Sequence, residues 1–166
     1  MDLSHPKGSS NNDSIDSELC SLSYASIDDA VANILQKGEG TVGTLLAKLD
    51  LESAYHIVPV HPHDRHLLGM QWDGKLYVDT ALPFGLRSAP KIFMALTDGL
   101  MWIMISHGIQ AAIHYLDDYL FFGAPGNEEC AEALRIVLEL CERLGVPVSK
   151  IEIEGPATVL SLIIAF

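Results

Sequence analysis

The sequence predicts an α+β fold in which helices pack on one face of a mainly antiparallel sheet. The chain has 166 residues, which is enough for one domain with a proper core. Its expected elements follow in the order helix, strand, hairpin, helix, hairpin, helix, strand. Hairpins join antiparallel strands, and helices beside a sheet of this kind are typical of the α+β class.

The first expected elements are an arm and a short amphipathic helix. Residues 1–20 are polar and aperiodic, which predicts a loop or an arm. Ser26 suits the N-cap of a helix that has Asp28 and Asp29 in its first turn and Gly38 past its end. One face of this helix carries an apolar stripe, made of Ile27, Ala30, Val31, Ile34 and Leu35.

The next segments predict strands. The pattern from residue 45 to residue 60 is apolar and strand-like, with an interruption at residues 50–53. Residues 66–72 and 75–80 predict a hairpin, because Asp73-Gly74 between them is a strong signal for a tight turn.

Two more helices and a last strand are expected. After a loop at residues 82–85, Ser88 suits the cap of a helix that runs to Gly108. This helix is apolar nearly all round, which predicts a place in the core. A third helix is expected from a cap at Asn127 to Gly145, and the chain closes with a strand at 159–166.

The composition is strongly acidic. Ten basic and 22 acidic side chains give a net charge of −12, which argues against a simple nucleic-acid binder. The acid is unevenly spread, because residues 41–110 carry a net charge of −1, residues 1–40 carry −5 and residues 111–166 carry −6. The charge therefore does not exclude a nucleic-acid substrate, but this chain lacks the basic surface needed to hold one tightly.

The cysteines indicate a reducing, intracellular location. Cys20, Cys130 and Cys141 form no C-x-x-C pair, so neither a disulfide framework nor a zinc ribbon is expected. The last two lie on the apolar face of the third helix, which predicts a packing role. We expect no signal peptide and no membrane span, because polar residues interrupt the 18 uncharged residues between Asp98 and Asp117.

Two adjacent carboxylates interrupt otherwise apolar sequence. Asp117-Asp118 lies between residues 109–115 and 119–122, which predict a hairpin with a charged tip. Adjacent carboxylates repel each other and lose solvation there, which is costly unless a cation or a proton compensates. A solvated hairpin turn is the alternative. The same dipeptide at Asp28-Asp29 has an ordinary explanation, since acidic side chains complement the dipole of a helix in its first turn.

A third carboxylate favours a metal site. Asp50 ends an apolar strand, residues 45–49, that can lie beside the hairpin of Asp117 in one sheet. Three carboxylates at one sheet edge offer the hard oxygen ligands that hold Mg²⁺ or Mn²⁺. Two such ions activate an attacking hydroxyl and stabilise a leaving pyrophosphate. The pattern therefore predicts phosphoryl or nucleotidyl transfer.

Three further segments are distinctive: Lys48 to Tyr55, Leu82 to Pro90, and Tyr-Leu-Asp-Asp at residues 115–118. In order and spacing they resemble motifs A, B and C of reverse transcriptases. The match covers most of the chain, which resembles the reverse transcriptase domain of retrotransposons, most of all the DIRS-like and gypsy-like group. Supporting likenesses lie at residues 2–6, 59–62 and 155–156.

The resemblance implies a polymerase palm with RNA-directed DNA polymerase activity. Its partners would be an RNA or DNA template with a primer, and dNTPs. The resemblance assigns two metal ions to Asp50 and Asp117, and makes Asp118 the second carboxylate of motif C. The backbone carbonyl of Leu51 would be a further ligand, and Leu116 would abut the primer end.

Other motif positions imply contacts with the nucleotide. Tyr55 falls where the family keeps an aromatic steric gate, a rigid ring that leaves no room for a 2′-hydroxyl. An ordinary strand aromatic is the alternative. Phe84 and Gly85 occupy the motif B loop, where glycine allows close approach of the backbone. Arg87 and Lys91 are placed to meet phosphates, although charges there are more often solvated.

The sequence also departs from the family. The motif D lysine position holds Glu152, with Lys150 two residues earlier. The upstream fingers, the thumb and any RNase H region are missing from the match, which implies that residues 1–23 are the tail of the fingers and residues 24–166 an incomplete palm. The alternative function is therefore a non-catalytic, truncated relic that keeps only the palm fold. Another two-metal nucleotidyl enzyme, such as a cyclase, is the third possible function.

Three histidines, His61, His63 and His66, form the other cluster with ligand chemistry. Alternate histidines on a strand can bind zinc, but no cysteine or fourth ligand lies near them. We therefore expect the three histidines to lie in solvent at the base of a hairpin.

Overall fold

The computed structural model describes residues 2–38 and 43–159. The chain forms two compact units. The first unit comprises Met1–Ser23 and Ser53–Leu96, and the second comprises Tyr24–Glu52 and Thr97–Phe166. No helix in the described ranges combines the length and the apolar character that a membrane crossing requires.

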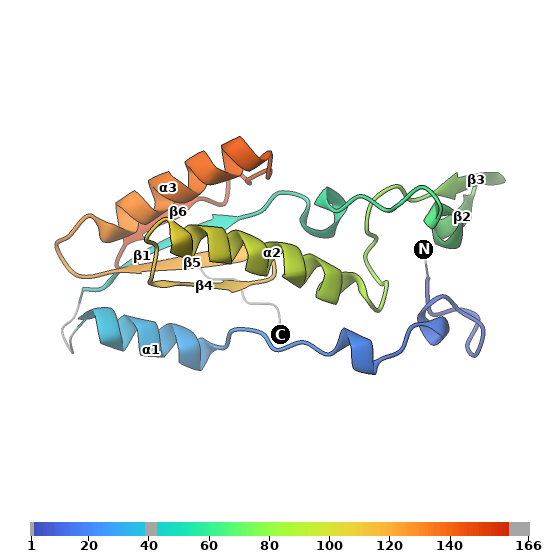
Figure 1. Ribbon diagram of the computed structural model, residues 1–166, viewed down its shortest axis with the longest axis horizontal. Coiled ribbons are helices and arrows are strands. Elements are labelled where there is room, and N and C mark those ends of the chain that lie inside the picture. The colour runs from blue at the N-terminus through green and yellow to red at the C-terminus, as the bar shows by residue number, and fades with distance from the viewer. Residues whose placement is uncertain (1, 39–42, 160–166) are drawn as a thin grey trace. The chain divides into compact units, whose positions relative to one another are not determined.

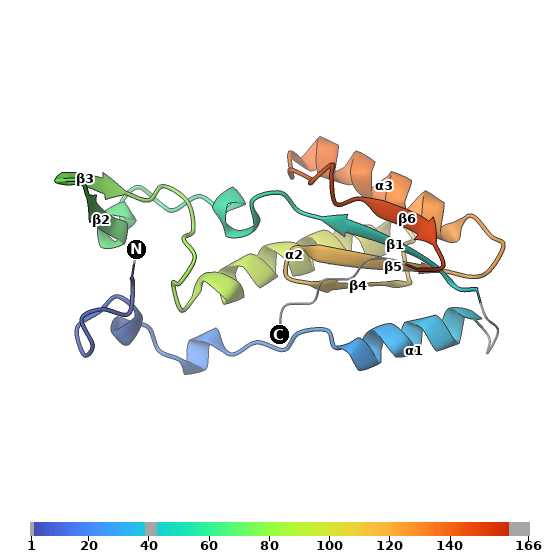
Figure 2. The ribbon, with the colours of Figure 1, turned by 180° about the vertical axis from the view of Figure 1, so that it is seen from behind.

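The second unit is built on a four-stranded antiparallel sheet (Figure 1). Its strands are β1 (Leu45–Asp50), β4 (Ala112–Tyr115), β5 (Asp118–Gly123) and β6 (Glu154–Ala157). They lie in the order β4-β5-β1-β6, which can be followed in Figure 2. The α+β prediction with a mainly antiparallel sheet is thus confirmed.

The core of this unit lies on one face of the two central strands. Paired residues of antiparallel strands share a face, and the pairs Leu49↔Tyr119 and Ala47↔Phe121 are fully buried. Helices α2 (Ala89–Ser106) and α3 (Glu129–Leu144) contact this face. The Tyr119 hydroxyl donates to the Thr97 carbonyl of α2 at 3.0 Å, and Cys130 of α3 lies 3.7 Å from the Phe121 carbonyl.

Helix α1 (Ile27–Gly38) begins as the sequence predicts. The Ser26 hydroxyl accepts from the Asp29 N–H at 3.2 Å, and the Asp29 carboxylate accepts from the Ser26 N–H at 2.8 Å, which is a reciprocal capping box. The predicted apolar stripe of this helix is only partly shielded from solvent, because Ile27, Val31 and Leu35 are exposed.

Helices α2 and α3 depart from prediction in detail. On α2, Ile92, Trp102 and Ile105 are exposed, so this helix is buried along one side and not all round. The N-cap of helix α3 is Glu128, one residue later than the expected Asn127, although the Asn127 side chain does accept from the Glu129 N–H at 3.2 Å. The packing role of Cys130 and Cys141 is confirmed, and burial raises the pKa of each thiol to about 11.

The strand expected after the interruption at residues 50–53 is wrong over most of its length. Ser53 and Ala54 have φ values of 70° and 39°, which turn the chain out of the sheet into a 3₁₀ turn at Ala54–Ile57. Only an isolated bridge between Pro59 and Ala81 remains of it. The predicted last strand falls, apart from Val159, outside the described residues, and the sheet gains β6 instead.

The first unit contains the predicted hairpin. Strands β2 (Gly69–Trp72) and β3 (Lys75–Val78) pair antiparallel. Asp73 and Gly74 both have positive φ, 49° and 70°, as a type I′ turn requires. The residues before β2, Arg65–Leu68, form a 3₁₀ turn and not the expected strand.

The sheet and α3 approach most closely at Gly123. A Cβ atom there would lie 2.7 Å from Cys130 Cβ and 2.9 Å from Cys130 N. We expect Gly123→Ala to lower the free energy of unfolding by about 1–3 kcal/mol, because the helix must move to admit a methyl group. Chemical denaturation measures this change.

Gly99 provides the control. It is exposed on α2, and a Cβ atom there would meet nothing within 4 Å. Gly99→Ala should raise the free energy of unfolding by about 0.5–1 kcal/mol. Equal stabilities for the two variants would contradict this account of the packing.

Candidate active site

Strand register brings three carboxylates together. Asp50, the last residue of β1, pairs directly with Asp118, the first residue of β5. Asp117 lies in the turn just before Asp118. Carboxylate oxygens of all three lie within 4.8 Å of one another, and all three side chains are half-buried. The three aspartates that the sequence singled out therefore form one cluster.

A tight turn presents Asp117. The pairing of Tyr115 with Asp118 leaves only Leu116 and Asp117 in the loop. Leu116 has a φ of 54°, a left-handed conformation that costs an L-residue roughly 1–2 kcal/mol. The Leu51 N–H donates to the Asp117 carbonyl at 3.1 Å, which ties this turn to the end of β1. The role of the Leu51 carbonyl as a ligand stays a prediction.

Burial and neighbouring negative charges raise the pKa of all three aspartates. For Asp50 the pKa rises to about 7, first through burial, then through a side-chain hydrogen bond with Glu152 and the negative charges of Asp117, Glu152 and Asp118. Burial is also the main cause of the raised pKa of Asp117 and of Asp118. Binding of a proton or a cation to the cluster is therefore favourable.

Lys48 is the cation that the chain itself supplies. Its side chain is 10% exposed, and its Nζ lies 3.5 Å from Asp118 Oδ1. This charge acts to lower the pKa of Asp118, against the larger effect of burial. One ammonium group does not neutralise three carboxylates, so the site keeps room for further positive charge.

Glu152 is a fourth acidic side chain at this site. After α3 the chain returns beside the end of β1, where the Ser149 N–H donates to the Asp50 carbonyl at 2.9 Å. The same stretch places Glu152 in a hydrogen bond with Asp50. The sequence marks Glu152 only as a departure from motif D, and local sequence gives no sign of this contact. Lys150 is exposed.

The expected nucleotide contacts Tyr55, Phe84 and Gly85 lie in the first unit. Tyr55 is in the 3₁₀ turn, so an ordinary strand aromatic is not the explanation for it. Its ring packs 4.9 Å from that of Phe84 and 5.2 Å from that of Phe93. Phe84 is 58% exposed, and Gly85 has a φ of 86°.

Asn12 braces the loop that contains Gly85, and sequence reasoning missed it. This buried side chain donates to the Gly85 carbonyl at 2.8 Å and accepts from the Arg87 N–H at 2.7 Å. The side chains expected to meet phosphates also contact the arm. Arg87 donates to the Ile15 carbonyl at 2.8 Å, and Lys91 donates to the Ser21 carbonyl at 3.2 Å.

The histidine cluster does not form a metal site. His61 and His63 stack with ring centroids 5.5 Å apart, and His66 Nδ1 lies 2.6 Å from the His63 carbonyl oxygen. All three side chains are exposed. Among the residues that the structure describes, the aspartate cluster is the one group of three that can hold a metal ion.

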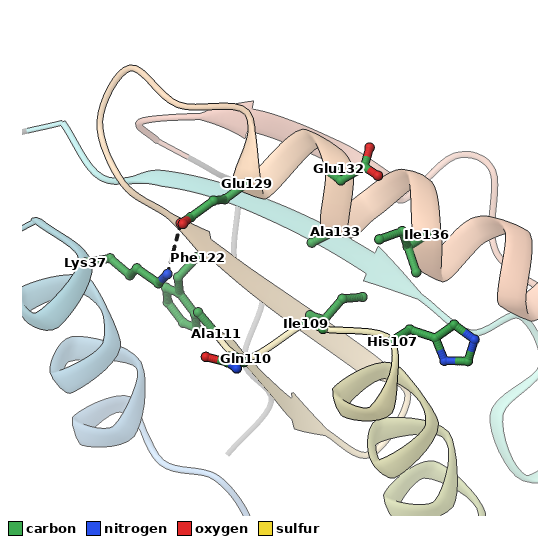
Figure 3. A pocket seen from close by; sticks show the side chains of 11 residues that line it. Lys37, His107, Ile109, Gln110, Ala111, Phe122, Glu129, Glu132, Ala133 and Ile136 are labelled. Atoms are coloured by element: carbon green, nitrogen blue, oxygen red, sulfur yellow. Dashed lines mark hydrogen bonds and ion pairs between the residues drawn. The ribbon is translucent and has the colours of Figure 1, made fainter.

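A pocket of about 320 Å³ lies at the other end of β5 (Figure 3). Its walls include Phe122, Ile109 and Ile136, and the ion pair between Lys37 and Glu129, 2.9 Å long, crosses one side. None of the three aspartates lines it. The pocket is therefore separate from the carboxylate cluster.

The comparison with protein families decides the identity of this fold. The family model described as reverse transcriptase (RNA-dependent DNA polymerase) matches residues 14–154, which include all three aspartates. The chain belongs to the reverse transcriptase family.

Curated relatives of this reverse transcriptase domain are viral and transposon polyproteins. The enzymatic polyprotein of Cestrum yellow leaf curling virus is 31% identical over 122 residues, which are 72% of this chain and 18% of the relative. The transposon Tf2-3 polyprotein of Schizosaccharomyces pombe is 26% identical over 111 residues, which are 66% of this chain and 8% of the relative. The chain thus spans less than a fifth of either polyprotein.

Solved structures show the same reverse transcriptase fold. A prototype foamy virus protease-reverse transcriptase aligns with a TM-score of 0.61 at 23% identity, over 84% of this chain and 17% of that one. The foamy viral enzyme in complex with an RNA/DNA hybrid aligns with a TM-score of 0.56 at 24% identity, over 70% of this chain and 15% of that one. These neighbours support the palm assignment.

The raised pKa of Asp50 predicts how stability depends on pH. Its pKa is about 7 in the folded chain, against about 3.9 in an unfolded one. A carboxyl group of this kind contributes its full stability below the unfolded pKa and loses it as the pH rises to the folded pKa. We expect the metal-free chain to lose about 1–2 kcal/mol of unfolding free energy between about pH 4 and 7, discounted for partial exposure.

Urea denaturation in the presence of a chelator measures this loss. Asp50→Asn should flatten the pH dependence, because an amide does not titrate. Asp28→Asn, which changes an exposed aspartate in the first turn of α1, should retain it. An unchanged slope in Asp50→Asn would contradict the assignment.

Proposed function

We propose that this chain is the catalytic core of an RNA-directed DNA polymerase that extends a primer with dNTPs by two-metal nucleotidyl transfer. The observation that carries the proposal is the convergence of Asp50, Asp117 and Asp118 within 4.8 Å. Membership of the reverse transcriptase family supports it and implies dependence on a divalent metal.

The aspartate cluster fits Mg²⁺ or Mn²⁺. All its candidate ligands are carboxylate oxygens, the donors that both ions accept, and half-burial leaves positions for water and substrate phosphate. Two bound ions would supply activation of the primer hydroxyl and stabilisation of the leaving pyrophosphate. Asp50 and Asp117 would hold both ions, with Asp118 and the Leu51 carbonyl as further ligands.

Other residues would position the substrates. Tyr55 would act as a steric gate against a 2′-hydroxyl, and the contacts of its ring with Phe84 and Phe93 support a fixed position for it. Phe84 and Gly85 would contact the incoming nucleotide, and exposure of the Phe84 ring suits that role. Leu116, beside Asp117 in the turn, would meet the primer end.

An RNA or DNA template with its primer would be the macromolecular partner. Foamy viral relatives of the same fold are known in complex with dsDNA and with an RNA/DNA hybrid. A net charge of −12 opposes tight phosphate binding. We therefore propose that segments outside these 166 residues, such as fingers and thumb regions, supply many of the contacts that bind nucleic acid.

A retrotransposon of the DIRS-like or gypsy-like group would be the source of the domain. Residues 2–6, 59–62 and 155–156 support this placement. Neighbouring DNA that encodes a tyrosine recombinase would favour the DIRS-like group, and its absence would count against that group.

One observation favours the alternative, a non-catalytic relic. Glu152 stands where the family has a lysine, and it hydrogen-bonds to Asp50. An acidic side chain there adds to the negative charge that a triphosphate must approach. Measurement of polymerase activity separates the two functions.

Primer extension on an RNA template with Mg²⁺ and dNTPs tests the proposal. We expect Asp50→Ala and Asp117→Asn each to lower the rate at least about 100-fold, because loss of a metal ligand removes several kcal/mol of transition-state stabilisation. Asp28→Asn is the matched control and should keep the wild-type rate, since Asp28-Asp29 is the same dipeptide in a helix turn.

Two results of this assay would contradict the proposal. If the wild-type chain is inactive even when it is expressed within a longer polyprotein, the result would favour the non-catalytic relic. Activity that survives Asp50→Ala would place the chemistry elsewhere. With Tyr55→Ala the same assay should incorporate ribonucleotides more readily, and unchanged sugar selectivity would contradict the gate.

A further inference from the structure

A buried histidine stands behind the turn that carries Leu116 and Asp117. His114 lies on β4 and is 9% exposed. Its Nδ1 lies 3.4 Å from the Leu116 carbonyl oxygen, and its Nε2 lies 3.0 Å from Asp98 Oδ1 on α2. Its ring also stacks on Tyr119 of β5, with centroids 5.2 Å apart and planes at 20°. The imidazole therefore connects the turn to helix α2.

The peptide group that His114 contacts decides the type of the turn. Type I′ and type II′ turns both begin with a residue of positive φ, and they differ by a flip of the central peptide. Leu116 is the first turn residue, with a φ of 54°, so its carbonyl belongs to that central peptide. A flip would demand positive φ at Asp117 as well and would redirect its carboxylate. A hydrogen bond to the Leu116 carbonyl opposes the flip.

Both partners of the imidazole are acceptors. A neutral histidine has one N–H, so it satisfies either the carbonyl or the carboxylate, and a doubly protonated ring satisfies both. Two titratable groups contact the ring, the Asp98 carboxylate and the Tyr119 phenol. The Tyr119 hydroxyl donates away from the ring, to the Thr97 carbonyl at 3.0 Å, which fixes the surface on which the imidazole stacks.

We propose that His114, anchored by Asp98, is a positioning residue that locks the Leu116-Asp117 peptide in the orientation that keeps Asp117 in the carboxylate cluster. The inference rests on the proposed function, because that function makes this turn part of a polymerase site. His114 itself touches neither substrate nor metal and acts through the turn.

Substitutions at His114 separate hydrogen bonding from packing. His114→Phe keeps a planar ring on Tyr119 but removes both ring nitrogens. His114→Asn places its side-chain amide nitrogen where Nδ1 lies, so it keeps an N–H donor for the Leu116 carbonyl. We expect His114→Phe to lower kcat of primer extension roughly 10- to 100-fold with a smaller change in the KM for dNTP, because a misplaced catalytic group costs rate. His114→Asn should restore kcat to within about threefold of wild type.

Two further variants distinguish a loss of positioning from a folding defect. The Asp98 side chain is 63% exposed, so Asp98→Ala leaves the core intact and should lower kcat in the same direction by a smaller factor. His107→Phe, at the exposed end of α2, is the matched control and should behave as wild type.

A readout without catalysis distinguishes this inference from the proposed function. In the metal-free protein, the backbone amide NMR signals of Leu116 and Asp117 should move in His114→Phe and stay nearer their wild-type positions in His114→Asn. Such movement in a chain that has no polymerase activity would support the turn lock and refute the proposed function. Unmoved amide signals in His114→Phe, or a kcat equal to that of His107→Phe, would overturn the inference.

Discussion

The site depends on the antiparallel pairing of β1 with β5. This register sets Asp50 opposite Asp118 and leaves Asp117 in the turn beside them. Side chains alternate between the faces of a strand, so a slip of one residue would send Asp50 to the buried face and dissolve the cluster. The fully buried pairs Leu49↔Tyr119 and Ala47↔Phe121 oppose that slip, because it would expose them. Core packing and site geometry are therefore set by the same register.

Repulsion among the carboxylates is the cost of this arrangement. The chain lessens it locally with Lys48 beside Asp118, whereas Glu152 adds a further acidic group beside Asp50. The remaining negative charge suits a cation better than a proton once the pH exceeds the raised pKa of Asp50. An uncompensated cluster would instead destabilise the fold, so stability and metal binding are linked through the same residues.

Local chemistry explains which features could be predicted from the sequence. The Asp73-Gly74 hairpin, the Ser26 cap and the Asp117-Asp118 turn follow from near neighbours along the chain. The motif spacing also located Asp50. The 3₁₀ turn at Ala54–Ile57 carries no glycine signal, so a strand was expected to resume there. The contacts of Asn12, His114 and Glu152 join residues distant in sequence, and no local pattern encodes them.

Crystals of the chain soaked in Mn²⁺ would test the central claim most directly, because anomalous scattering locates the ion without assuming a reaction. The account predicts an anomalous peak about 2.1 Å from carboxylate oxygens of Asp50 and Asp117, since Mn²⁺ accepts the same hard oxygen ligands as Mg²⁺. The peak should vanish in Asp117→Asn. A site that stays empty while Mn²⁺ binds elsewhere, for example at His61 and His63, would contradict the account.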